Sequence, residues 1–540
     1  MAIDLRDKSG LLIDDMPEMR STVRIQLNDC GLMKCDMARN IKEGMDRLTA
    51  NRYDIIVCDY NLGQGADGQQ FLELVRRSHL LPQSTAFLMI TGETGYEQVS
   101  TAAEFAPDDY LLKPFTSETL RTRLERILEK KETLKPVYKH LGEKSDRKAA
   151  LAACDELLSQ KTRYTLDLLR LKGELLLASG RTDEALALYE GVLQQRATPW
   201  AEVGKARCLA ADGNHEQAKD HLKAALAAYP NYLAAYDSLA GLLEKTDKAA
   251  AQEIVEQALK VAPSTQRQRR LGGLALENKD FVRAEAAFRR TVEKDRTGFF
   301  KSHDDYAGLA KSCSEQGKTQ EALAAVKDMA VHFQRTPELA ARQAAVEAQV
   351  HAKAGNTREA MVALEKALAV HKEADLDPTT ALEVAQACFA GGQPDAAKRI
   401  IETLAEDNHE NEQILAQAQS VFAAAGLDDE GTLLLDATKR RMIKLNNDAV
   451  ALAKAGELDQ AIAMLQEAAD RLHKNCQVSV NAALALLMHI QKNGMDTDKL
   501  GNAHRYILQA RRANPEHPRL PEVVAFYRRL APPGTPIVED

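Results

Sequence analysis

The stretch Ile55–Gly68, IIVCDYNLGQGADG, joins an apolar run to a carboxylate and then to a segment with three glycines. The run before Asp59 shows no alternation of apolar and polar residues, which is typical of a strand covered by helices on both faces. Asp59 stands at the carboxyl end of that run, where open α/β sheets gather their functional groups. The stretch therefore predicts a buried parallel strand that presents one carboxylate to a site.

Four further apolar runs of strand length alternate with helical stretches on either side of this strand. The runs are GLLIDD (10–15), MKCDMA (33–38), AFLMIT (86–91) and DYLLKP (109–114), and helices are expected over 17–30, 41–51, 68–78, 95–105 and 117–131. Five successive strand–helix units predict an α/β domain with a five-stranded parallel sheet and helices on both faces.

Polar residues stand at four of the five predicted strand ends: Asp14 and Asp15, Asp59, Thr91 and Lys113. Three neighbouring carboxylates repel one another, so a hard divalent cation with oxygen ligands, Mg²⁺ above all, is expected among them. With that charge balanced, Asp59 can act as a nucleophile toward a phosphoryl group that Thr91 and Lys113 contact. The alternative is that each residue only caps a helix or ends a strand, but that does not explain why all five fall at strand ends.

These residues carry a family resemblance. Residues 9–131 resemble the receiver domain of bacterial two-component response regulators through LLIDDM, IIVCDYN, LMITGE and YLLKPF. The resemblance implies a flavodoxin-like fold and phosphorylation of Asp59 by a partner histidine kinase or histidine phosphotransfer protein. It also implies that Mg²⁺ is held by Asp14, Asp15, Asp59 and the backbone carbonyl of Asn61.

The resemblance implies a switch as well, because Tyr110 falls where the family keeps an aromatic residue whose position follows the state of Thr91. One departure lies next to the site. Receivers commonly have a proline in the loop after the phosphoacceptor and a glycine eight residues beyond it, whereas here Gly68 is nine residues beyond Asp59 and no proline intervenes. The glycines at 63, 65 and 68 therefore predict an enlarged and looser loop over residues 62–68.

Beyond residue 145 the dominant feature is a helical repeat. Small residues early in every second helix recur first every 33 residues and then at wider or narrower spacings: Ala185, Ala218, Ala251, Ala284, Ala322, Ala360, Ala396, Gly431, Ala461 and Ala503. A period near 34 residues resembles tetratricopeptide repeats (TPR). It predicts an all-α superhelical solenoid of about nine or ten repeats whose groove binds an unidentified protein or peptide; an undifferentiated helical bundle is the alternative.

The predicted plan is a receiver at 1–131, a helical linker at 132–146, a repeat array at 147–520 and a C-terminal tail at 521–540. It predicts a response regulator whose output is protein binding, as a scaffold or modulator of other signalling proteins. The chain is not expected to be an enzyme beyond phosphorylation and dephosphorylation at Asp59. One alternative is a phosphate sink that competes for a shared kinase, with the repeats docking that kinase. A DNA-binding regulator is a weaker alternative.

Composition narrows the classes of partner. A net charge of −8 over 540 residues and the lack of a compact basic domain argue against nucleic acid. No apolar run approaches the roughly 18 residues that span a bilayer, so no membrane insertion is expected. Eight cysteines without a CxxC pair predict reduced thiols in a cytoplasmic protein. Phosphorylation is expected to bias homodimerisation of the receiver or its packing against the array.

Overall fold

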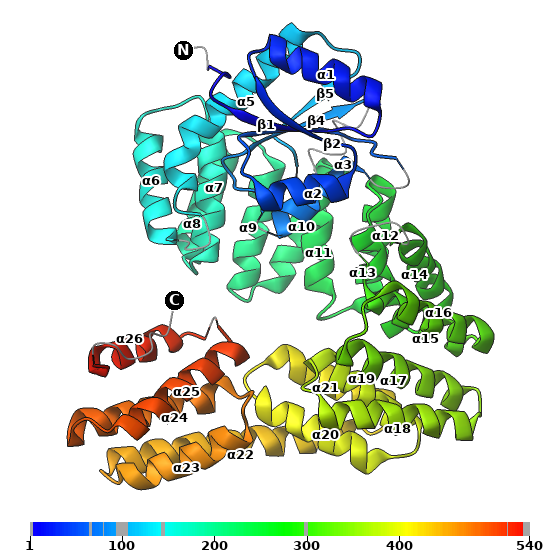
Figure 1. Cartoon of the computed structure of the whole chain (residues 1–540), viewed down its shortest axis with the longest axis vertical. Coiled ribbons are helices and arrows are strands. Elements are labelled where there is room, and N and C mark those ends of the chain that lie inside the picture. Colours follow the sequence, from blue (N-terminus) through cyan, green and yellow to red (C-terminus); the bar gives the residue numbers. More distant parts are fainter. Residues whose placement is uncertain are drawn as a thin grey trace. The chain divides into compact units, whose positions relative to one another are not determined.

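The computed structural model describes residues 4–63, 67–78, 80–92, 106–141, 146–295, 301–515 and 517–532. The chain divides into two compact units, residues 1–308 and residues 309–540. The first unit holds an α/β domain and the beginning of a helical array, and the second holds the rest of the array (Figure 1). Each unit is described by itself.

Five parallel strands form one sheet in the described part of the α/β domain. They are β1 (Ser9–Ile13), β2 (Lys34–Ala38), β3 (Ile55–Asp59), β4 (Ala86–Thr91) and β5 (Asp109–Leu112). The strand order is β2-β1-β3-β4-β5, so the winding of the chain reverses between β1 and β3. Sheets of this kind bind ligands outside the carboxyl ends of the strands at that reversal. The five-stranded parallel sheet predicted from the sequence is confirmed.

Helices cover both faces of this sheet, with α1 (Pro17–Asp29) and α5 (Ser117–Tyr138) on one face and α2 (Ile41–Ala50) and α3 (Gly68–Arg77) on the other (Figure 1). Side chains of one strand alternate between the two resulting cores. In β3, residues 55 and 57 pack toward α1 and α5, and residues 56 and 58 pack toward α2 and α3. Both faces are apolar, which explains the unbroken apolar run. The helix predicted over 95–105 lies outside the described residues.

Helix α5 continues past residue 131, where the sequence predicts the end of the α/β domain, and reaches Tyr138. Its first half contributes Leu120 and Leu124 to the core beside the sheet. Its last turns contribute Leu134 and Val137 to the first core of the helical array. One uninterrupted helix is therefore packed into two hydrophobic cores.

The helical array begins in the N-terminal unit and continues to Leu530. Its helices in the first unit are α6 (Arg147–Ser159), α7 (Thr165–Ala178), α8 (Thr182–Gln195), α9 (Pro199–Ala211), α10 (His215–Ala228), α11 (Leu233–Leu243), α12 (Lys248–Val261), α13 (Thr265–Glu277) and α14 (Phe281–Asp295), and α15 (His303–Glu315) contains the boundary between the units. The helices of the second unit are α16 (Thr319–His332), α17 (Pro337–Lys353), α18 (Thr357–Glu373), α19 (Pro378–Ala390), α20 (Pro394–Asp407), α21 (Glu412–Ala424), α22 (Asp428–Lys454), α23 (Leu458–Arg471), α24 (Cys476–Asn493), α25 (Thr497–Ala513) and α26 (Leu520–Leu530).

Close packing in the array depends on small residues at fixed places. The repeated alanines Ala185, Ala218, Ala251 and Ala284 are all fully buried. Tyr189 packs where Gly173 and Gly204 lack side chains, since a Cβ at either glycine would lie within 2.6 Å of the tyrosine ring. Neighbouring helices can therefore approach one another closely enough to share a continuous core.

Three details of the array differ from the sequence-based expectation. The small residue buried in α20 is Ala397, not Ala396, which is only partly buried. Helix α22 is 27 residues long and packs against both α21 and α23, because no glycine or proline interrupts it between Gly431 and Lys454. The segment predicted as a tail begins with α26, whose Val523 and Tyr527 are buried against α24 and α25.

No helix in the described ranges has both the length and the apolarity that crossing a membrane requires. Seven of the eight cysteines are buried and Cys476 is partly buried, and none of these eight described residues forms a disulfide.

Candidate functional site

Three carboxylates meet at the carboxyl edge of the sheet. Asp14 and Asp15 follow β1, and Asp59 is the last residue of β3, the strand paired with β1. One carboxylate oxygen from each residue lies within 4.8 Å of the other two. Asp14 and Asp59 are buried, whereas Asp15 is more exposed. The sheet topology thus brings together the three acidic residues that the sequence predicts as metal ligands.

An ammonium group joins the carboxylates from the neighbouring end of β5. The Nζ of Lys113 lies 3.0 Å from Oδ2 of Asp59 and 3.5 Å from Oδ2 of Asp14. The backbone N–H of Lys113 donates to the carbonyl of Thr91 at 2.8 Å, which ties the end of β5 to the end of β4. Backbone pairing of the strands therefore places the Lys113 main chain beside the site, and its side chain reaches both carboxylates.

Asp14 is held by two donors from the start of α1. The backbone N–H of Met16 donates to Asp14 Oδ1 at 2.9 Å, and the Arg20 guanidinium donates to the Asp14 carbonyl at 2.5 Å. Sequence reasoning did not select Arg20. Its place in the first turns of the helix that follows the acidic pair is the signal that could have identified it.

Burial raises the pKa of Asp14 and of Asp59 above the ordinary aspartate value, and the nearby Lys113 ammonium opposes that rise at both. Even with the Lys113 ammonium and the Arg20 guanidinium nearby, the three carboxylates leave a formal negative charge uncompensated within one small site. A divalent cation offsets that charge, and the available donors are all oxygen atoms, which Mg²⁺ prefers. The residues present therefore fit a magnesium ion.

Thr91 lies on β4, the strand that pairs with β3, and Tyr110 lies on β5, which pairs with the other side of β4. Asp59 pairs with Ile90, so Thr91 is one residue beyond the partner of Asp59 at the end of β4. Tyr110 pairs with Met89 and is 4% exposed, in the core that α2 and α3 cover. The register therefore places Thr91 beside the acidic cluster, whereas Tyr110 stands further back along its strand.

The loop after Asp59 is anchored at both of its described ends. Leu62 is buried in the core, and Asn61 forms an antiparallel bridge with Asp67. Asp67 caps α3 by accepting the N–H of Gln70 at 2.7 Å. The loop predicted to be loose therefore has fixed ends, and Gly65, in the middle of it, lies outside the described residues.

Gly68 closes the loop against β3. Its N–H donates to the carbonyl of Tyr60 at 2.6 Å, and a Cβ at this position would lie 2.3 Å from the backbone oxygen of Asp59. Only glycine allows the start of α3 to approach the strand this closely.

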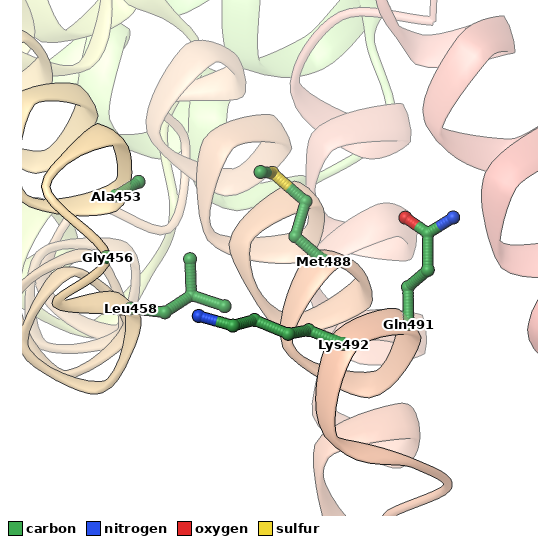
Figure 2. Close-up of a pocket in the computed structure, with 6 residues that line it drawn as sticks. All are labelled: Ala453, Gly456, Leu458, Met488, Gln491 and Lys492. Carbon is green, nitrogen blue, oxygen red and sulfur yellow. The ribbon is translucent and has the colours of Figure 1, made fainter.

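A separate recess of about 320 Å³ lies in the C-terminal unit between the α22–α23 turn and α24 (Figure 2). Its lining residues are Ala453, Gly456, Leu458, Met488, Gln491 and Lys492. Figure 2 shows Lys492 extending from its helix toward Leu458, while Gln491 points away. This lining has no carboxylate, imidazole or thiol, so the recess lacks the acidic groups that define the cluster at the sheet edge, and its charged side chain is Lys492.

Family models match both parts of the chain. A response regulator receiver domain matches residues 11–125. Two tetratricopeptide repeat models match the helical array, one at residues 176–243 and 351–420 and the other at residues 236–298.

Individual relatives agree with the receiver model. The chain is 32% identical over 120 residues to chemotaxis protein CheY-3 of Vibrio cholerae serotype O1, across 22% of this chain and 91% of that protein. It is 30% identical over 120 residues to chemotaxis protein CheY of Pseudomonas aeruginosa, across 22% of this chain and 95% of that protein.

Two solved structures resemble separate parts of the chain. One is the chemotaxis response regulator CheY4 of Vibrio cholerae, with 30% identity, 22% of this chain and 98% of that chain covered, and a TM-score of 0.21. The other is a tetratricopeptide repeat protein from Parabacteroides merdae, with 17% identity, 44% and 92% coverage, and a TM-score of 0.30.

The fold and the acidic site define a signalling protein with a receiver domain at its N-terminus. The chain belongs to the response regulator receiver family, and its receiver is followed by tetratricopeptide repeats, a protein-interaction region.

Proposed function

We propose that this chain is a two-component response regulator that accepts a phosphoryl group on Asp59 from a histidine kinase or a histidine phosphotransfer protein. The observation that carries the proposal is the position of Lys113, whose Nζ lies 3.0 Å from Asp59 Oδ2 beside two further carboxylates. A buried carboxylate next to one ammonium and a cation site can attack a phosphoryl group whose negative charge is already balanced.

In the transfer, an oxygen of the Asp59 carboxylate forms a new bond to phosphorus while the phosphorus–nitrogen bond of a phosphohistidine breaks. The leaving imidazole takes up a proton. The Lys113 ammonium pairs with a phosphoryl oxygen, and the Thr91 hydroxyl donates to another. Hydrolysis of the resulting acyl phosphate returns Asp59 to its carboxylate form.

The carboxylates of Asp14, Asp15 and Asp59 and the backbone carbonyl of Asn61 would hold Mg²⁺. When bound, the ion supplies positive charge that stabilises the oxygens of the transferring phosphoryl group. The buried pair Asp14 and Asp59 then no longer depends on Lys113 alone for charge balance, which frees the ammonium to contact the phosphoryl oxygens.

The proposed output is protein binding by the repeat array, as a scaffold or modulator of other signalling proteins. The packing of helix α5 supports control of this output by the receiver. The helix is packed into the receiver core through Leu120 and Leu124 and into the first array core through Leu134 and Val137. A change at Thr91 and Tyr110 that moves β5 or α5 would therefore displace the helices of the first repeats that pack against α5.

Phosphorylation is tested on the full chain with acetyl phosphate and Mg²⁺, followed by intact-mass spectrometry. Wild type should gain one phosphoryl group that alkaline treatment removes, and Asp59→Asn or a chelator should abolish it. An adduct of equal yield on Asp59→Asn, or none on folded wild type, contradicts the assignment.

The output is tested by affinity capture with the wild type in the presence and absence of beryllofluoride, a phosphoryl mimic. Partners whose retention changes with beryllofluoride on wild type, but not on Asp59→Asn, support a phosphorylation-controlled array. A bound set that is the same in all samples would favour a receiver that only draws phosphate from a shared kinase.

A further inference from the structure

Gly63 lies directly against one of the three clustered carboxylates. A Cβ built on Gly63 would lie 2.7 Å from Oδ2 of Asp15, and the three nearest atoms it would meet all belong to Asp15. Ordinary carbon–oxygen contacts are about 3.3–3.6 Å. A side chain at this position therefore requires the carboxylate or the loop to move by several tenths of an ångström.

The loop backbone is the less mobile of the two. Leu62, the preceding residue, is 4% exposed and packs in the core. The N–H of Gly63 donates to Oδ1 of Asn61 at 3.1 Å, and Asn61 is bridged to Asp67. Asp15 instead ends in a partly exposed carboxylate on a rotatable side chain. The strain of an added Cβ would consequently be relieved by displacing Asp15.

We infer that Gly63 is a positioning residue for the cation site, because its missing side chain leaves the space in which the Asp15 carboxylate stays within the acidic cluster. This inference rests on the proposed function of that cluster. Mg²⁺ tolerates little displacement of its ligands, since it requires near-octahedral geometry at about 2.0–2.1 Å. Substituting Gly63 should therefore weaken cation binding without removing any ligand.

Three variants of the full chain separate this effect from backbone strain. Gly63→Ala adds the Cβ in a left-handed conformation with φ of +69°. Gly63→Asn adds the same Cβ, but asparagine adopts that conformation more readily. Gly180→Ala is the matched control, because Gly180 has φ of +70° and its surroundings leave open space within 4 Å of an added Cβ.

Binding of Mn²⁺ to the metal-free protein is followed by electron paramagnetic resonance, with Mg²⁺ as competitor and circular dichroism as the check on folding. Both Gly63 variants should bind Mg²⁺ at least about 10-fold more weakly, as metal sites usually do when their supporting groups are altered. Gly180→Ala should match wild type. With acetyl phosphate, the Gly63 variants should need about 10-fold more Mg²⁺ for half-maximal phosphorylation and reach the wild-type rate at saturation.

Wild-type affinity in both Gly63 variants would overturn the inference while leaving the proposed function intact. Recovery of affinity in Gly63→Asn but not in Gly63→Ala would also overturn it, because strain and not the Cβ contact would then be the cause. If wild type itself binds no divalent cation, the proposed function of the acidic cluster fails first.

Discussion

At the scale of single residues, the start of α3 meets β3 at a contact that only glycine permits. A Cβ at position 68 would lie 2.3 Å from the backbone oxygen of Asp59 and 2.8 Å from the sulfur of Met89. Because the first of these atoms belongs to the central strand, it cannot move aside as a side chain would.

Gly68→Ala should therefore destabilise the receiver by about 1–3 kcal/mol, the usual cost of overpacking a core. The measurement is chemical unfolding followed by a probe within the receiver. Gly92→Ala is the control in the same domain, because an added Cβ there meets open space within 4 Å. Equal stability of Gly68→Ala and wild type would show that the start of α3 can retreat from the strand.

A buried ion pair fixes β5 to α5 at the opposite end of the sheet from the acidic cluster. The Nζ of Lys131 lies 2.7 Å from Oδ1 of Asp108 and donates to the carbonyl of Gln83 at 2.8 Å. Burial lowers the pKa of Lys131, and the Asp108 carboxylate opposes that shift. The Asp108 carboxylate thus stabilises the charged form of the lysine.

Asp108→Asn should destabilise the receiver by about 3 kcal/mol, because it leaves the buried Lys131 cation without its anion and removes negative charge near the partly buried Arg76. Adding Lys131→Met should recover much of that loss, since the double variant buries one cation fewer. Urea unfolding of the two variants measures both effects. Additive losses in the double variant would mean that the pair is not coupled.

At the scale of elements, α20 ends in an acidic residue that its surroundings do not favour. Burial raises the pKa of Asp407 from an ordinary value of 3.8 to about 6, although His473 and Lys474 oppose the rise and Glu406 and Asp375 add to it. A negative charge at a helix C-terminus is also unfavourable to the helix dipole.

The Asp407 carboxyl group stays protonated in the folded state at pH values where it has lost its proton in the unfolded chain. Asp407 therefore makes the protein less stable as the pH rises from about 4 to about 6. The full cost, at most about 3 kcal/mol, is present above about pH 6. Asp407→Asn should therefore match wild type near pH 4 and exceed its stability at about pH 7.5. Thermal unfolding at the two pH values checks this, and a variant advantage that does not grow with pH would contradict it.

At the scale of the whole molecule, α5 is the element that belongs to both the receiver and the array. Its two halves sit in separate hydrophobic cores, and its middle is held by the pair of Lys131 with Asp108. A rigid helix with this packing transmits rotation or displacement, whereas a flexible linker would not.

Inserting Gly-Ser-Gly between Thr133 and Leu134 should leave both cores folded and phosphorylation of Asp59 unchanged. It should abolish any beryllofluoride-dependent change in hydrogen exchange of α6, α7 and α8, which wild type is expected to show. Hydrogen-exchange mass spectrometry of the two proteins makes the comparison. If the insertion leaves that change at its wild-type size, α5 is not the connection.

Local patterns in the chain were enough to predict the receiver fold, the repeat array and the acidic, hydroxyl and lysine residues at the strand ends. Unbroken apolar runs and a 33-residue period are visible in the sequence itself, and parallel strands deliver all their carboxyl ends to one edge. These features do not depend on how particular side chains pack.

Only the tertiary structure shows which glycines are necessary and where the helices end. The sequence treats Gly63 and Gly68 alike as loop residues, but one faces the Asp15 carboxylate and the other the Asp59 backbone. Nor could it show that α5 enters a second core or that α26 packs onto the array. Each of these depends on contacts between residues distant in the chain, which local patterns of hydrophobicity do not encode.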